Sequence, residues 1–145
     1  MSAPSARRRL GKLGYGRRRG ENGSVTLELA VLAPALLLVI FAVVQGALYF
    51  YARSVALGSA QEGVRVGRAY QSSVAAGETT AREFLAQAGG GFLQNPAVSS
   101  AGSTSVDVCM QMTGEALAVL PGVPKLGVSQ SSCGPVERFT TPGNP

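Results

Sequence analysis

The feature that most constrains this chain is an uncharged stretch of 24 residues at positions 29–52. As an α-helix rising about 1.5 Å per residue it spans roughly 36 Å, more than the hydrocarbon thickness of about 30 Å of a bilayer. A secretory signal peptide has a much shorter apolar region, followed by a small-x-small cleavage site. An aromatic run, residues 49–51, and Arg53 then follow, as expected at a membrane interface. The sequence therefore predicts a retained transmembrane helix over residues 24–52.

The charges are distributed unevenly on the two sides of this segment. Residues 1–23 carry seven of the 13 Lys and Arg residues and a single acid, Glu21, whereas the remainder is nearly balanced. Basic residues next to a span favour the cytoplasmic side, so residues 1–23 are predicted to be a cytoplasmic leader and residues 53–145 an extracellular domain. The leader also attracts anionic lipid. Nucleic-acid binding is not expected, because the basic tract contains one aromatic residue, Tyr15, and is not predicted to be part of a folded domain.

Glu28 is an acidic residue at the N-terminal end of the apolar helix. One interpretation is structural, because an acid in the first helical turn interacts favourably with the helix dipole, by roughly 0.3–1 kcal/mol. The other begins with a cut after Gly23, which makes Ser24 a new N-terminus with Glu28 as its fifth residue. A charge in a membrane helix is costly unless it is paired, and the freed α-amine of a neighbouring copy is a suitable partner. Glu28 would then set the register of an assembly.

Small residues recur every four positions just beyond the span, at Ala52, Ala56, Ala60 and Val64. Such a stripe allows another helix to approach closely. Alternatively, the stripe packs beneath the outer domain of its own chain. The sequence leaves both interpretations open.

The outer segment is predicted to be a small α+β domain. The long helix should extend over residues 53–70, and the capping-box spacing from Thr80 opens a short helix that ends at Gly89. Alternating apolar residues predict a half-buried strand whose inner face carries Val106, Val108, Met110 and Met112. Thr113-Gly114 indicates a turn. Two more strands, residues 125–131 and 136–139, would complete a three-stranded antiparallel sheet, with loops at 71–77 and 95–103 and an extended or helical stretch at 117–120.

The chain has two cysteines, Cys109 and Cys133, and no histidine. An even count in an exported segment favours a disulfide, which would contribute on the order of 3 kcal/mol, with two free thiols as the alternative. Two cysteines alone do not form a structural zinc site, so no metal or other cofactor is expected. The absence of histidine excludes a Ser-His-Asp arrangement, the acids are scattered, and the phosphate-binding Gly-Lys-Ser/Thr motif is missing. We therefore expect that the protein is not an enzyme.

The segment GSVTLELAVLAP at residues 23–34 resembles the opening of TadE-like proteins, the minor pseudopilins of tight-adherence (Flp-type IV) pilus systems. Residues 51–65 are similar to the stretch of this family just past the membrane, and residues 135–139 resemble its ending. The richness in alanine, arginine and glycine suggests the actinobacterial branch. Major Flp pilins are much shorter and commonly have a tyrosine after the glutamate, where Leu29 stands here. The resemblance therefore implies a minor pseudopilin with a large head.

The resemblance also implies roles for particular residues and partners. Gly23 would precede the cut made by a prepilin peptidase, Ser24 would begin the mature protein, and Glu28 would be the assembly residue. The implied partners are that peptidase, other pilins or pseudopilins, the pilus membrane platform and membrane lipid. The alternative is an uncleaved, single-span, membrane-anchored extracellular binding domain.

Overall fold

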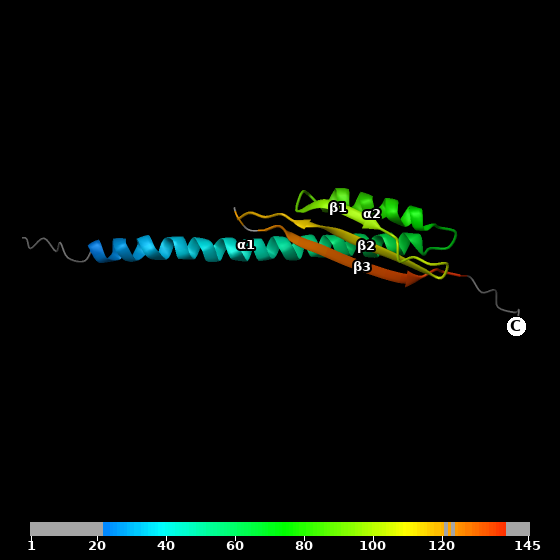
Figure 1. Cartoon of the computed structure of the whole chain (residues 1–145), viewed down its shortest axis with the longest axis horizontal. Helices are drawn as coiled ribbons and strands as arrows, with labels where there is room; N and C mark the ends of the chain where they lie inside the picture. The colour runs from blue at the N-terminus through cyan, green and yellow to red at the C-terminus, as the bar shows by residue number, and fades with distance from the viewer. Residues whose placement is uncertain (1–21, 121, 123, 139–145) are drawn as a thin grey trace, which may run out of the picture. The chain divides into compact units, whose positions relative to one another are not determined.

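The computed structural model describes residues 22–120, 122 and 124–138, and the side chains from Val25 onward. Its elements follow the order α1 (Asn22–Gly67), α2 (Val74–Ala88), β1 (Leu93–Ser99), β2 (Asp107–Ala116) and β3 (Leu126–Pro135) (Figure 1). The predicted fold class is confirmed: a long apolar helix precedes a short helix and a three-stranded antiparallel sheet. The chain divides into two compact units, Met1–Leu37 and Leu38–Pro145, and each is described by itself.

The described part of the first unit is the N-terminal portion of α1. Its side chains from Val25 onward are exposed, and Pro34 lies inside the helix. Among the described residues, α1 is the one helix long and apolar enough for a membrane span. Its most apolar stretch has a mean hydropathy of 2.7, and none of that stretch is buried. Exposed apolar side chains on all sides of this stretch are expected of a helix whose surroundings are lipid.

The second unit has one hydrophobic core, to which the rest of α1, α2 and all three strands contribute. Alternate residues of β2, namely Val108, Met110 and Met112, are at most 1% exposed. This confirms the predicted period of two over these residues. Val106 precedes β2 and is half exposed, so it falls outside the pattern.

The helix boundaries differ from those predicted. α1 ends at Gly67 rather than at residue 70. α2 begins at Val74 because Ser73 is its N-cap, with the Ser73 Oγ accepting a hydrogen bond from the backbone N–H of Ala76. Thr80, predicted as the start, lies inside α2, where its hydroxyl donates to the Ala76 carbonyl. The prediction of a loop over residues 71–77 was therefore wrong from residue 74 onward.

The predicted loop over residues 95–103 was also wrong, because β1 occupies Leu93–Ser99 and pairs with β2. The register shifts between Gln94 and Ala97, and within this bulge Asn95 has a φ of 49°. Proline cannot donate a ladder hydrogen bond, so it is confined to edge strands and bulges. Pro96 lies in such a bulge on the edge strand of the sheet.

The ends of β2 and β3 differ from the prediction as well. Thr113-Gly114 is not a turn, since β2 continues to Ala116 and Gly114 pairs with Val128. β3 is one strand over Leu126–Pro135, not two, and residues 136–138 are not in a strand. Phe139 lies outside the described residues. Residues 117–120 are neither helical nor in a strand.

The structure confirms the disulfide between Cys109 and Cys133. The two residues are direct partners in the β2–β3 register, with their Cα atoms 4.1 Å apart. The bridge therefore fixes the alignment of these two strands.

Candidate functional site

The residues of the predicted cleavage site lie at the beginning of α1. The helix starts at Asn22, so the Gly23–Ser24 peptide bond is helical in the intact chain. Glu28 comes after the first turn, which contains no acidic residue, and the dipole effect fades within that turn. The dipole interpretation of Glu28 therefore loses its basis in the uncut chain.

The Glu28 side chain is exposed, and none of the ion pairs among the described residues involves it. An exposed carboxylate on an apolar helix surface needs a counter-charge if that surface enters a bilayer. Such a charge would have to come from outside the described part of the chain.

The small-residue stripe is covered by the domain of its own chain. Ala52, Ala56 and Ala60 are fully buried, and Val64 is 5% exposed. α1 and α2 come very close at Gly77, where an added Cβ would lie 2.4 Å from the Gly63 carbonyl oxygen. The buried Ser59 hydroxyl donates a 2.8 Å hydrogen bond to the Ala81 carbonyl across the same contact. The stripe thus serves helix packing within the chain, one of the two alternatives left open.

Gln45 is a functional candidate that the sequence reasoning missed. It is 7% exposed although it lies inside the predicted span, and Gln45 and Ser59 are the buried polar residues of the described chain. Its Nε2 donates to the Leu117 carbonyl at 3.1 Å, and its Oε1 accepts from the Val119 backbone N–H at 2.9 Å. One amide side chain therefore joins α1 to the segment that follows β2. The signal in the sequence was that Gln45 is the one amide side chain in the apolar run of residues 29–52.

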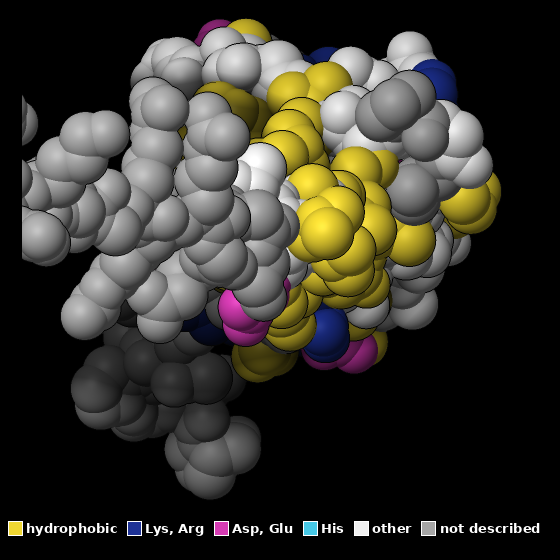
Figure 2. Space-filling view, turned by 90° about the vertical axis from the view of Figure 1, so that its left-hand side faces the viewer, with side chains coloured by type: hydrophobic (Ala, Val, Ile, Leu, Met, Phe, Trp, Pro, Cys, Tyr) yellow, Lys and Arg dark blue, Asp and Glu magenta, His cyan; other side chains and the backbone are white. Residues whose placement is uncertain are grey.

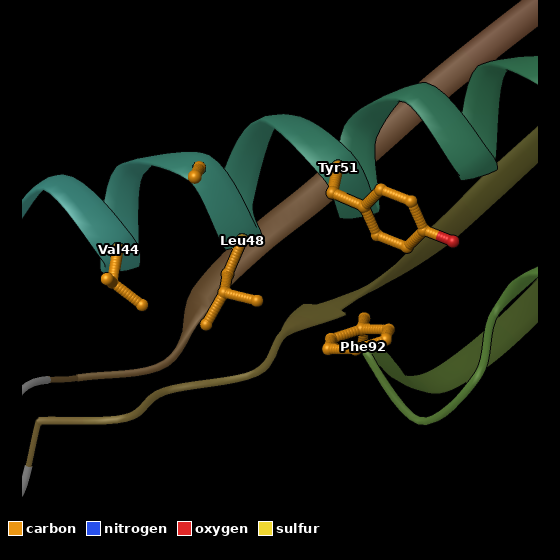
Figure 3. A pocket seen from close by; sticks show the side chains of 5 residues that line it. Val44, Leu48, Tyr51 and Phe92 are labelled. Atoms are coloured by element: carbon orange, nitrogen blue, oxygen red, sulfur yellow. The ribbon is translucent and has the colours of Figure 1, made fainter.

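An apolar groove of about 470 Å³ lies beside this connection. It is lined by Val44, Ala47, Leu48 and Tyr51 of α1 and by Phe92, which precedes β1 (Figure 3). The Tyr51 and Phe92 rings meet edge to face with centroids 5.2 Å apart. The Tyr51 hydroxyl donates to the Ala88 carbonyl at 3.0 Å, at the C-terminal end of α2.

Large hydrophobic side chains are also exposed elsewhere in this unit, including Phe50 and Val119. Figure 2 shows a field of hydrophobic side chains on one face of the molecule, with a few charged side chains along its margin. Monomeric soluble proteins rarely expose large contiguous apolar patches, so such a face indicates a partner or a membrane.

The polar side of the domain holds a small network on the sheet. The Glu115 Oε2 accepts hydrogen bonds from Lys125 at 2.9 Å and from Asn95 at 3.2 Å. These bonds, from Lys125 above all, hold the pKa of Glu115 below its usual value. Within the described residues, no group of three His, Cys, Asp or Glu side chains is placed to hold a metal ion.

Comparison with known proteins identifies one family. Residues 23–65 match the family model described as TadE-like protein, which covers α1 from Gly23 nearly to its end. No curated protein and no solved structure matches the chain. The chain therefore carries, over most of α1, a segment similar to TadE-like protein.

Proposed function

We propose that this protein is a minor pseudopilin of a tight-adherence pilus or of a related secretion system. In this proposal a prepilin peptidase cuts after Gly23, and the mature chain assembles with other pilins or pseudopilins through α1. Its role is structural rather than catalytic. The observation that carries the proposal is the family match, which begins at Gly23 and includes Glu28.

The charge pattern supports a topology for this role. A basic leader before an apolar helix favours a cytoplasmic N-terminus and an extracellular domain. The disulfide supports the same side for the domain, because such bonds persist in oxidising compartments.

The exposure of Glu28 on α1, without an ion pair among the described residues, supports an assembly contact. The side chain is exposed and is surrounded by apolar positions of the same helix. A cut after Gly23 creates a positive α-amine at Ser24, and the amine of an adjacent copy can then neutralise Glu28. A paired charge inside a bundle of membrane helices is far less costly than an isolated one, so the pair favours one register.

One observation favours the uncleaved alternative, in which the protein is an anchored extracellular binding domain. The Gly23–Ser24 bond lies within α1, and a peptide bond must leave the helix before a protease can cut it. The bond lies at the end of α1, however, where opening costs little free energy.

The N-terminus of the protein recovered from native membranes distinguishes the two functions. Intact mass and terminal-peptide mass spectrometry should find a chain that begins at Ser24. A chain that retains its leader contradicts processing and favours the anchored binding domain.

The role of Glu28 is tested by Glu28→Gln, which removes the charge and keeps the shape. We expect normal membrane insertion but loss of co-purification with the other pilus components. Glu62→Gln is the matched control, because Glu62 is a carboxylate on the same helix that pairs with Arg65. Equal co-purification of both variants with the pilus components would contradict an assembly role for Glu28.

A further inference from the structure

The exposure of α1 changes abruptly at Gln45. Each of the 20 side chains from residue 25 to residue 44 is exposed, and Gln45 is buried. Twenty helical residues rise about 30 Å, which equals the hydrocarbon thickness of a typical bilayer. The length of uncovered helix therefore matches the bilayer, and the domain begins to cover α1 where the hydrocarbon would end.

This placement shortens the span expected from the sequence, which extended to residue 52. A bilayer of 40–45 Å, headgroups included, leaves roughly 5–7 Å of headgroup layer on each side. Along α1 that layer corresponds to about four or five residues beyond Val44. The groove then begins at Val44, at the boundary between acyl chains and headgroups, and extends past Leu48 through the headgroup layer.

We propose that the groove lined by Val44, Ala47, Leu48, Tyr51 and Phe92 binds an acyl chain of an outer-leaflet phospholipid, so that this end of the domain rests in the headgroup layer. The proposal deepens the proposed function and rests on it, because it requires α1 to cross the membrane.

The chemistry of the groove favours lipid over a second protein helix. All five lining residues are uncharged, and the hydroxyl of Tyr51 is already bonded to Ala88. Helices that pack closely in membranes rely on small residues, whereas this groove presents four large side chains and one alanine. Its volume of about 470 Å³ is within the range of sites for small molecules, about 300–1,000 Å³.

The exposed side chains next to the groove fit the same surroundings. Of the residues that line the groove, Phe92 is 38% exposed and Tyr51 45% exposed. Aromatic residues are enriched where headgroups meet hydrocarbon, since their rings are apolar while the interface remains partly hydrated. These two aromatic residues come from separate segments and meet only in the folded domain.

Tryptophan fluorescence can test the proposal, because the chain contains no tryptophan. The full-length Phe92→Trp variant is reconstituted into vesicles with phospholipids brominated on the acyl chain near the headgroup, and bromine quenching is measured. Val106→Trp is the matched control, because Val106 is exposed next to the opposite end of β2. We expect Phe92→Trp to lose most of its emission in brominated vesicles, while Val106→Trp keeps most of its emission.

Two results would overturn the inference. Equal quenching of the two variants would mean that the groove is not in contact with lipid. If Phe92→Trp becomes less quenched by bromine as the protein-to-lipid ratio increases, a second copy of the protein fills the groove. Leu48→Trp, on the opposite wall, gives an independent measurement if the substitution at residue 92 disturbs folding.

Flotation of the vesicles separates this inference from the proposed function. Protein that does not float with the vesicles contradicts the membrane span, and both proposals fail. Protein that floats but shows equal quenching contradicts the acyl-chain site alone.

Discussion

At the scale of single residues, Gln45 decides where the domain meets α1. Its amide satisfies one backbone donor and one backbone acceptor of the segment after β2. A buried polar group that loses its partner costs about 1–3 kcal/mol, so this side chain stabilises the contact chiefly by completing both bonds.

We predict that Gln45→Leu destabilises the domain by about 1–3 kcal/mol, because the Val119 N–H and the Leu117 carbonyl lose their partner. Urea unfolding in a membrane mimetic measures the stability, and hydrogen exchange of the Val119 amide reports the local opening. Gln61→Leu is the control, since Gln61 is exposed on the same helix. Equal stability of the two variants would contradict the prediction.

A second residue-scale prediction concerns Glu115, whose pKa is lowered by hydrogen bonds from Lys125 and Asn95. A depressed folded-state pKa stabilises the protein above the unfolded pKa of about 4.3, and the contribution disappears as the pH falls through the folded-state value. Lys125→Gln should therefore raise the pKa of Glu115, as measured by NMR titration of its carboxyl carbon. Arg82→Gln, which removes the partner of Glu78, should leave Glu115 unchanged.

At the scale of elements, the sequence predicted those features whose signal is local and periodic. The alternation through Val108, Met110 and Met112 identified the central strand, and the two cysteines indicated the bridge to β3. The misplaced boundaries come from local signals that tertiary contacts override. Asn95-Pro96 has the composition of a loop, but β2 supplies hydrogen bonds on both sides of the bulge.

In the candidate site too, residues in a contiguous motif could be found from the sequence, whereas residues that depend on distant contacts could not. Gly23, Ser24 and Glu28 could be proposed from the sequence because their motif is contiguous, and the family match begins at residue 23 as well. Their roles stay predictions. Gln45 could not be proposed, because both of its partners lie more than 70 residues later in the sequence. Phe92 likewise acquires its place in the groove only once the domain has folded against α1.

The crossing of α1 and α2 gives a prediction at this scale. Alanine normally stabilises a helix relative to glycine, but a Cβ at Gly77 would lie 2.4 Å from the Gly63 oxygen and 2.8 Å from Met110 Cε. Gly77→Ala should therefore destabilise the protein by about 1–3 kcal/mol, which thermal unfolding measures. Gly46→Ala is the control, because nothing lies within 4 Å of its added Cβ, and it should not be destabilised. Equal melting of the two variants would contradict this account.

At the scale of the whole molecule, α1 belongs both to the apolar segment and to the core of the domain. The TadE-like match covers the same continuous helix, with Ala52, Ala56 and Ala60 fully buried. There is no separate linker in the described chain between the two parts of α1, because the helix is unbroken from Asn22 to Gly67.

This continuity has a consequence for shedding from the cell surface. Arg53 is exposed, but its neighbour Ala52 is fully buried and the backbone there is helical, so a protease must open the domain before it can cut. We predict that trypsin cuts the reconstituted protein after Lys125 and Arg138, which lie outside the helices and strands, well before it cuts after Arg53. Mass spectrometry of the released fragments over time checks the order. Early cleavage at Arg53 would contradict it, whereas late cleavage means that the domain resists release by any enzyme that acts on its folded state.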